Sequence, residues 1–129
     1  MLKDELRAMI PSKYNKFDKL ESEDPYHFDS WGMDKYGNEC LYYWFYSKDK
    51  SKRNQKRVVI SEIENLLRDN VNQEIIKRSD FEEHCPVTLS AGPCGYAVTV
   101  RLLEYLGIAK YQGRSGIQLI NKQKIQSLI

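Results

Sequence analysis

The chain has 129 residues, of which 41% are hydrophobic and 29% are charged. This length and composition predict one packed globular domain with room for a small appendage, and they exclude a wholly disordered protein. No apolar run approaches the roughly 18 residues that cross a bilayer, so we expect no membrane span. The N-terminus lacks a basic stretch followed by an apolar one, so we expect no secretory signal. Three cysteines are too few for a disulfide scaffold, which favours reduced thiols and a cytoplasmic protein.

The net charge of +2 hides an asymmetry along the chain. Residues 1–47 carry six basic and nine acidic side chains, a balance of −3, whereas residues 48–129 carry fourteen and nine, a balance of +5. A basic C-terminal part is suited to polyanions, and an acidic N-terminal part repels them. From charge alone, solvated surface charge is the simpler interpretation.

The first 57 residues are predicted to form an aromatic-rich α/β extension. Apolar residues share a helical face before Pro11 and again after it: Leu2, Leu6 and Met9, then Tyr14, Phe17 and Leu20. Nine of the fifteen aromatic residues lie between Tyr26 and Tyr46, and the aromatic run 42–46 predicts a strand. Residues 58–60 are a plausible partner strand, which makes residues 48–57 a long basic hairpin loop or a linker.

From residue 60 onward, caps and turns mark the elements more sharply. Two capping boxes, Ser61–Glu64 and Ser79–Glu82, predict two helices with a short strand at residues 74–77 between them. The first helix is expected to end at Asn70 and the second at Pro86.

A turn at residues 87–92 precedes a longer helix. Pro93 suits the first position of this helix, and Gly107 suits the left-handed residue that follows its end. The rest of the chain is expected to form two short strands, the glycine turn between them and a final helix capped by Asn121, at residues 109–112, 117–120, 113–116 and 121–129.

This order of elements leads to a resemblance. Residues 61–120 resemble a winged helix-turn-helix domain, mainly through Leu102–Ile108 followed by Gly113–Ile117. In that family the helix after the turn is the recognition helix and the glycine-rich hairpin is the wing. We therefore expect an α+β fold with a winged helix-turn-helix-like core at residues 58–129 and the aromatic-rich α/β extension at residues 1–57.

A second resemblance is carried by Cys85–Thr88 and Gly92–Gly95. In this combination the chain is similar to small uncharacterised proteins of bacterial mobile elements. That likeness implies nothing about activity.

The helix from Pro93 to Leu106 is poorly suited to reading DNA bases. Its apolar side chains cover more than half of the circumference at 100° per residue, and Arg101 is its one basic residue. A groove-reading helix needs several long polar side chains that point outward. We expect the face formed by Val98, Leu102 and Tyr105 to be covered by the aromatic N-terminal part or by a second subunit.

The basic segment is the other candidate site. It places six positive charges within ten residues, opposed by Asp49: Lys48, Lys50, Lys52, Arg53, Lys56 and Arg57. Charge density and reach suffice for phosphate binding, and interleaved aromatic rings stack on unpaired bases. Lys110 and Arg114 on the wing are expected to join this surface, and Arg101 is also expected to contact nucleic acid. The alternative is a solvated loop that keeps an aromatic hairpin soluble.

No metal site, cofactor or catalytic set is predicted. Zinc sites usually contain a close Cys-x-x-Cys pair, a spacing that His84 and the three cysteines do not show. The chain also lacks a glycine-rich phosphate loop, a nucleophile elbow and a His-Glu-x-x-His pattern, so we expect no enzyme. The tryptophans and tyrosines of residues 26–46 fit either an aromatic core, which is the better interpretation, or a ligand pocket.

These patterns favour a small non-enzymatic protein that binds duplex DNA through the basic loop and the wing. The alternative is a protein-interaction module, such as a homodimer, that does not read DNA. The wide apolar face of the helix after Pro93 motivates this alternative.

Overall fold

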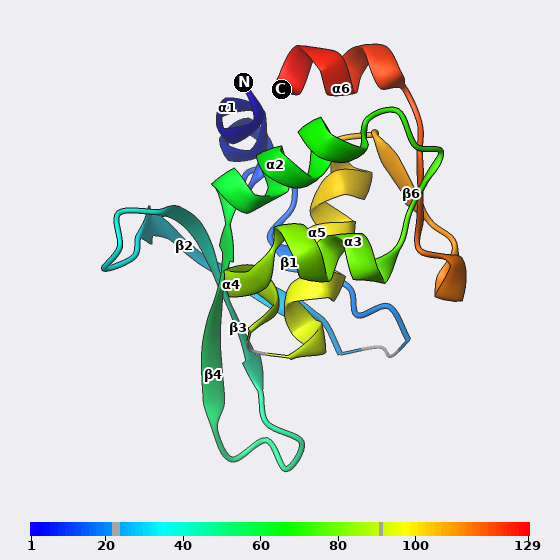
Figure 1. The fold of residues 1–129 in the computed structure, drawn as a ribbon. Helices are drawn as coiled ribbons and strands as arrows, with labels where there is room; N and C mark the ends of the chain where they lie inside the picture. Colours follow the sequence, from blue (N-terminus) through cyan, green and yellow to red (C-terminus); the bar gives the residue numbers. More distant parts are fainter. Residues whose placement is uncertain (22–23, 91) are drawn as a thin grey trace.

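The computed structural model describes residues 1–21, 24–90 and 92–129, which form a mixed α+β fold (Figure 1). In this described part of the chain, two antiparallel sheets pack with six α-helices. Among the same residues, no helix combines the length and the apolar character that crossing a membrane requires.

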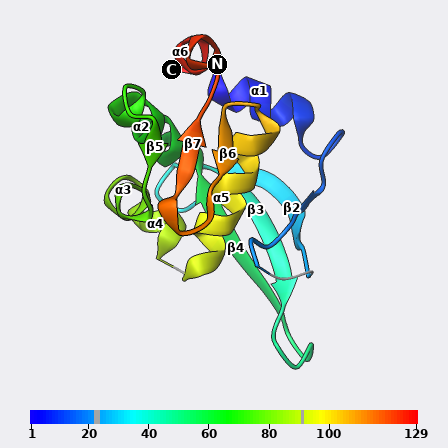
Figure 2. The same cartoon turned by 90° about the vertical axis from the view of Figure 1, so that its right-hand side faces the viewer.

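A four-stranded sheet dominates the N-terminal half. Its order is β1-β2-β3-β4, and the strands are Lys16–Phe17, Tyr26–Met33, Glu39–Tyr46 and Arg53–Val59. Helix α1 (Leu2–Met9) buries Leu2 and Leu6 in the core beside this sheet. The far ends of β3 and β4 project from the body of the molecule as a two-stranded hairpin (Figures 1 and 2).

The C-terminal half combines five helices with a smaller sheet. The helices are α2 (Ile60–Asn70), α3 (Arg78–His84), α4 (Pro86–Leu89), α5 (Pro93–Tyr105) and α6 (Lys122–Leu128). The strands are β5 (Ile75–Ile76), β6 (Ala109–Tyr111) and β7 (Ile117–Leu119), in the sheet order β5-β7-β6. A short 3₁₀ turn at Gly113–Ser115 joins β6 to β7.

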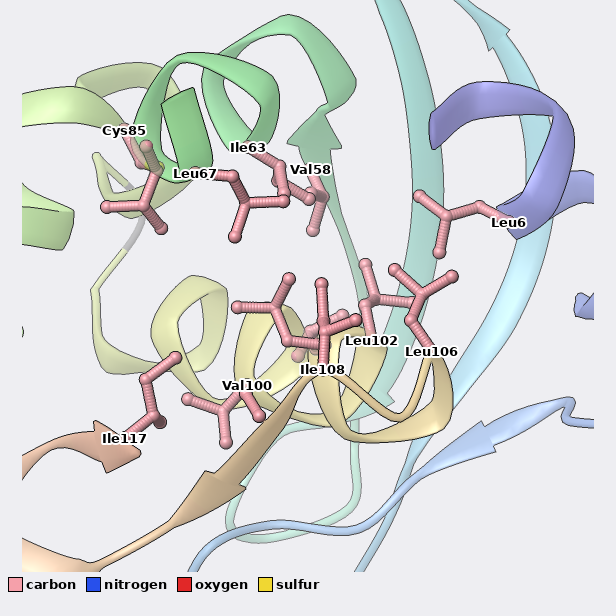
Figure 3. Close-up of a cluster of buried hydrophobic side chains, with 14 of the residues drawn as sticks. Leu6, Val58, Ile63, Leu67, Cys85, Val100, Leu102, Leu106, Ile108 and Ile117 are labelled. Carbon is pink, nitrogen blue, oxygen red and sulfur yellow. The ribbon is translucent and has the colours of Figure 1, made fainter. Parts of the chain in front are cut away.

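Helix α5 lies at the centre of the molecule. It contacts β1 and β4 of the larger sheet and β6 of the smaller one. Leu102, Leu106 and Val100 point from this part of the chain into the same cluster as Leu6, Val58 and Ile63 (Figure 3). The buried apolar residues of both halves therefore form one continuous core, and burial of this apolar area is the main force that holds them together.

A buried polar network also ties the halves together. The amide of Val59, at the end of β4, donates to the Thr88 hydroxyl at 3.0 Å. That hydroxyl donates to the Glu62 carboxylate at 2.7 Å, and the amides of Val87 and Thr88 donate to the same carboxylate at 3.0 and 2.8 Å. Glu62 of α2 thus provides the acceptors for the first turn of α4, where no helical partner exists.

Several local predictions from the sequence are confirmed. Pro93 begins α5, and α2 ends at Asn70. Gly107 has a φ of +74°, and the amide of Ile108 donates back to the carbonyl of Leu103 at 3.2 Å, as expected for a glycine-capped helix end. The predicted cap of the last helix is also present, since Asn121 Oδ1 accepts from the amide of Lys124 at 3.3 Å.

Both predicted capping boxes are wrong. Helix α2 begins at Ile60, because β4 runs into it without a loop, and Ser61 therefore lies inside the helix. Helix α3 begins at Arg78, with the amide of Lys77 donating to Asp80 Oδ2 at 2.9 Å. In both cases the helix starts earlier than the serine that resembled its cap.

Three other expectations are corrected. The second helix predicted around Tyr14, Phe17 and Leu20 is replaced by β1, which pairs with β2. The turn predicted at residues 87–92 contains helix α4, whose first residue is Pro86. The loop predicted at residues 48–57 is shorter, because Arg53–Val59 pairs with β3 along its whole length.

The boundary expected between residues 57 and 58 falls inside β4. Arg57 pairs with Tyr42 and Val58 with Leu41, so the ladder continues across this position. Residues 1–57 pack on the C-terminal half and share its core.

Candidate nucleic-acid interface

The larger sheet has an inner face against the core and an outer face toward solvent. Leu41 and Tyr43 of β3 are fully buried, and Val58 of β4 lies opposite Leu41. Because side chains alternate along a strand, the residues between them belong to the outer face. The outer residues of β3 and β4 are Tyr42, Trp44 and Tyr46, which lie opposite Arg57, Gln55 and Arg53.

Trp44 is at the centre of an aromatic group on this outer face. Its ring stacks on the His27 ring of β2, with centroids 4.2 Å apart and planes 18° apart. The Tyr46 ring meets it edge-on at 5.2 Å, and the guanidinium of Arg53 lies 4.0 Å from its centroid. Burial, Lys16 and Arg53 lower the pKa of His27, so this imidazole is neutral at pH 7 and stacks as an uncharged ring.

Both outer-face arginines of β4 already have carboxylate partners. Arg53 lies 3.7 Å from Asp29, which also accepts a hydrogen bond from Gln55. Arg57 Nε lies 3.2 Å from Asp34 Oδ2, an ion pair in which this N–H makes no hydrogen bond within the described residues. Burial of Asp34 opposes ionisation, but hydrogen bonds from Asn38 and from the amide of Tyr36, together with Arg57, hold its pKa below the usual value.

Three lysines at the hairpin tip are exposed to solvent. The turn closes where the amide of Ser47 donates to the carbonyl of Lys52 at 2.8 Å. Asp49 accepts from the hydroxyls of Ser47 and Ser51, and hydrogen bonds from Ser51 and Ser47 lower its pKa to about 2. Lys48, Lys50 and Lys52 are exposed and pair with no carboxylate among the described residues. We call these three residues the tip lysines.

A hollow of about 510 Å³ lies at the base of the hairpin. It forms because β2–β3 pairing ends at His27 and Trp44, while Phe45 and Tyr46 continue beyond it. We call it the hairpin hollow, and its lining is Lys19, Asp24, Pro25, Tyr26, His27, Phe45, Tyr46, Ser47, Lys48 and Lys50. The lining thus contains four aromatic rings and three lysines: Tyr26, His27, Phe45 and Tyr46, with Lys19, Lys48 and Lys50.

The structure separates the nine basic residues expected at the site. The tip lysines and Arg53 belong to the hairpin, whereas Lys56 alternates to the inner side of β4 and lines a different hollow with Val87 of α4 and with Ser90, the residue after α4. Arg57 is half-buried in its ion pair. The expected joint surface is therefore smaller than the basic segment 48–57.

Lys110 and Arg114 do not join the hairpin. They lie on β6 and on the turn after it, at the edge of the smaller sheet, whereas the β3–β4 hairpin projects from another part of the molecule (Figures 1 and 2). The wing and the basic hairpin are two separate surfaces. This corrects the expectation that they form one.

Arg101 is also unavailable as a free cation. Its Nε donates to the carbonyl of Asp18 at 2.9 Å, its Nη2 donates to the carbonyl of Lys19 at 3.3 Å, and Nη1 pairs with Glu104. These bonds fasten α5 to the segment after β1. Arg101 is thus a structural contact within the chain.

The chain's own N-terminal sheet covers the apolar face of α5. Val98 and Leu102 have no exposed surface, so they form no partner interface, which corrects that expectation. The Tyr105 ring stacks on Tyr14 with centroids 3.9 Å apart, and its hydroxyl donates to the carbonyl of Lys16 at 2.8 Å. Every residue from Cys94 to Tyr105 is buried or half-buried, so α5 has no face free to enter a DNA groove.

Reasoning from the sequence missed His27, Tyr46 and Lys19 as site residues. The alternation of Tyr42, Trp44 and Tyr46 was a usable signal, because it places three rings on one face of a strand. His27 and Lys19 had no such signal, since their position depends on strand pairing between distant segments.

The cysteines do not group with other potential metal ligands among the described residues. Cys40, Cys85 and Cys94 are buried, and burial raises the pKa of Cys85 to about 12. Within residues 1–21, 24–90 and 92–129, no three His, Cys, Asp or Glu side chains are grouped closely enough to hold a metal ion.

Comparison of the chain with family models, with curated proteins and with solved structures finds no match. The geometry of the described residues is therefore the basis for the functional argument.

Proposed function

We propose that the protein binds nucleic acid through the β3–β4 hairpin. The observation that carries this proposal is the group of three exposed tip lysines beside an aromatic outer sheet face. A cation that contacts a phosphate releases counterions condensed on the nucleic acid, and lysines without a carboxylate partner are available for such contacts. The aromatic rings beside them give the hairpin a second kind of contact that a solvated loop does not need.

Charge distribution around the hairpin supports the same proposal. Asp29 pairs with Arg53 and Asp34 with Arg57, so these two carboxylates are matched by arginines. Asp49 in the turn and Asp24 in the lining of the hairpin hollow are the carboxylates that lie near the tip lysines. Three lysines against these two carboxylates leave a net positive charge at this end of the hairpin. Such a cluster attracts a polyanion and speeds its association at low salt.

We further propose that the C-terminal half is a winged-helix-like scaffold in a cytoplasmic protein. The order α2, β5, α3, α5, β6, β7 and the sheet order β5-β7-β6 support this architecture. Because α5 is covered, its proposed role is to hold the larger sheet and not to read bases. A fold does not determine a function, and here the accessible chemistry lies on the other sheet.

The proposal is tested with a triple variant of the tip lysines, Lys48→Gln, Lys50→Gln and Lys52→Gln. Binding of a labelled oligonucleotide is followed by fluorescence anisotropy between about 50 and 200 mM salt, a range over which phosphate contacts weaken strongly. We expect at least a tenfold weaker affinity at the lowest salt. The slope of log K against log salt should become less negative by about 2–3, since each of the three lost phosphate contacts removes roughly 0.7–0.9.

The matched control is the wing double variant, Lys110→Gln and Arg114→Gln. It removes two exposed cations from a surface that is separate from the hairpin. We expect its affinity to stay within about twofold of the unmodified chain. An equal loss in both variants, or no binding of any oligonucleotide by the unmodified chain at about 50 mM salt, would contradict the proposal.

A further inference from the structure

We propose that the hairpin hollow binds an unpaired base, so that the protein prefers single-stranded to duplex nucleic acid. This inference rests on the proposed nucleic-acid binding and names the form of the ligand. It is carried by the rings and lysines that line the hollow and by its place at the end of the β2–β3 ladder.

The size of the hollow suits a single nucleotide. Its volume of about 510 Å³ lies within the roughly 300–1,000 Å³ of small-molecule sites. Tyr46 is 53% exposed and stands at the rim, while Tyr26 is buried with its ring edge-on to Phe45 at 5.4 Å. Tyr26 and Phe45 thus give the hollow a packed aromatic wall, and the exposed Tyr46 ring is part of the same lining.

The charges around the hollow match a phosphate backbone. Lys19, Lys48 and Lys50 line it from two separate segments of the chain, against the carboxylate of Asp24. The Lys19 ammonium lies 5.3 Å from the Tyr26 ring centroid, which places a cation directly beside the aromatic wall. A base against the rings would therefore have lysines within reach of the phosphates on either side.

A paired base cannot use this arrangement. In a duplex, the π-faces of the bases are covered by their neighbours, and only their edges and the phosphates are accessible. An antiparallel sheet that presents aromatic rings, by contrast, is a common platform for splayed bases of single strands. An acidic peptide would satisfy the lysines but would leave the rings without a flat partner.

The first test compares three probes of equal length with the unmodified chain. The probes are a deoxythymidine oligomer, the same backbone with abasic sites, and a duplex. Stacking is worth about 1–3 kcal/mol per base, so the thymidine strand should bind at least fivefold more tightly than the abasic strand. It should also bind more tightly than the duplex and change the fluorescence of Trp44, whose ring stacks on the His27 ring that lines the hollow.

The second test compares Tyr46→Leu with Tyr36→Leu. Both tyrosines are exposed, at 53% and 71%, but Tyr36 lies in the β2–β3 turn and does not line the hollow. We expect Tyr46→Leu to weaken the thymidine strand about fivefold or more while abasic binding is unchanged. Tyr36→Leu should change neither, and both variants should melt like the unmodified chain.

The outcomes separate this inference from the proposed function. Equal binding of the thymidine and abasic strands, or tighter binding of the duplex, would overturn the unpaired-base site and leave phosphate binding intact. Tight binding of polyglutamate in place of oligonucleotides would indicate an acidic protein partner and overturn both. The absence of binding to all probes would also overturn both.

Discussion

The buried carboxylate of Glu62 accepts hydrogen bonds from a separate segment of the chain. Its three donors belong to Val87 and Thr88, 25 and 26 residues further along the chain. The Thr88 hydroxyl also accepts a hydrogen bond from the amide of Val59 in β4. Glu62 thus acts at the junction where the larger sheet, α2 and α4 meet.

We predict that Glu62→Ala destabilises the fold by about 3 kcal/mol. The amides of Val87 and Thr88 and the Thr88 hydroxyl would lose a charged acceptor while they remain inside the protein. For a chain of this size the midpoint of thermal unfolding should fall by about 10 °C. Glu82→Ala is the control, since Glu82 is 63% exposed and pairs with Arg78 at 3.7 Å. Its midpoint should move by no more than about 2 °C, as expected for a surface pair. Equal shifts in both variants would show that the Glu62 network does not support the fold.

The helices and strands differ in how far local sequence specifies them. Pro93, Gly107 and Asn121 mark helix ends through their own backbone preferences, so the ends of α5 and the start of α6 were predictable. Strand β4 was predicted only at its end, where Val58 and Val59 pair with β3 as expected. Its basic residues were not recognised as a strand, because they favour one only when β3 supplies a pairing ladder and ring contacts. The helix starts predicted at Ser61 and Ser79 were wrong for a related reason. A strand precedes each helix closely, and each helix begins one residue before the serine, at Ile60 and Arg78.

The same contrast applies to the candidate site. The basic segment and the aromatic run were visible as composition, and the sequence left a hairpin loop and a linker as alternatives, of which the structure has the hairpin. The separation of the tip lysines from Lys56, Arg57 and the wing could not be read from the sequence, because it depends on strand alternation and on where two sheets lie in space. Arg101 was misread because its partners at Asp18 and Lys19 are more than 80 residues away.

The close packing of α4 against α5 requires a glycine at position 95. A Cβ at this position would lie 2.0 Å from the carbonyl oxygen of Thr88. Alanine normally gains about 1 kcal/mol over glycine inside a helix. Here α4 would have to move away, and that shift would also disturb the bonds between Thr88 and Glu62.

We therefore predict that Gly95→Ala lowers the free energy of unfolding by about 2 kcal/mol, because overpacking outweighs the helix preference. Urea unfolding of the purified variant measures this value. Gly107→Ala serves as the comparison, since its φ of +74° strains alanine by about 1 kcal/mol but no atom lies within 4 Å of the added Cβ. A more stable Gly95→Ala variant would mean that α4 does not approach α5 as described.

At the scale of the whole molecule, the two halves depend on each other through α5. The smaller sheet covers one side of this helix, and the larger sheet covers the side that includes Val98 and Leu102. The apolar face that suggested a dimer in the sequence is thus satisfied within one chain. A helix that is apolar on two sides needs two layers, and this chain supplies both.

This dependence predicts that residues 58–129 alone do not form a stable monomer. Without residues 1–57, the core loses large buried side chains such as Leu6, Phe17 and Tyr43, and the face of Leu102 becomes exposed. An exposed apolar face of this kind promotes association. We expect sedimentation of the fragment to show oligomers or aggregates. We also expect its thermal unfolding to show no cooperative transition, whereas the full chain unfolds cooperatively.

The double substitution Val98→Ser and Leu102→Ser in the fragment should reduce its association, since it removes the apolar surface that drives this association. A monomeric fragment that unfolds cooperatively would show that the C-terminal half folds independently and that the larger sheet is an appendage to it.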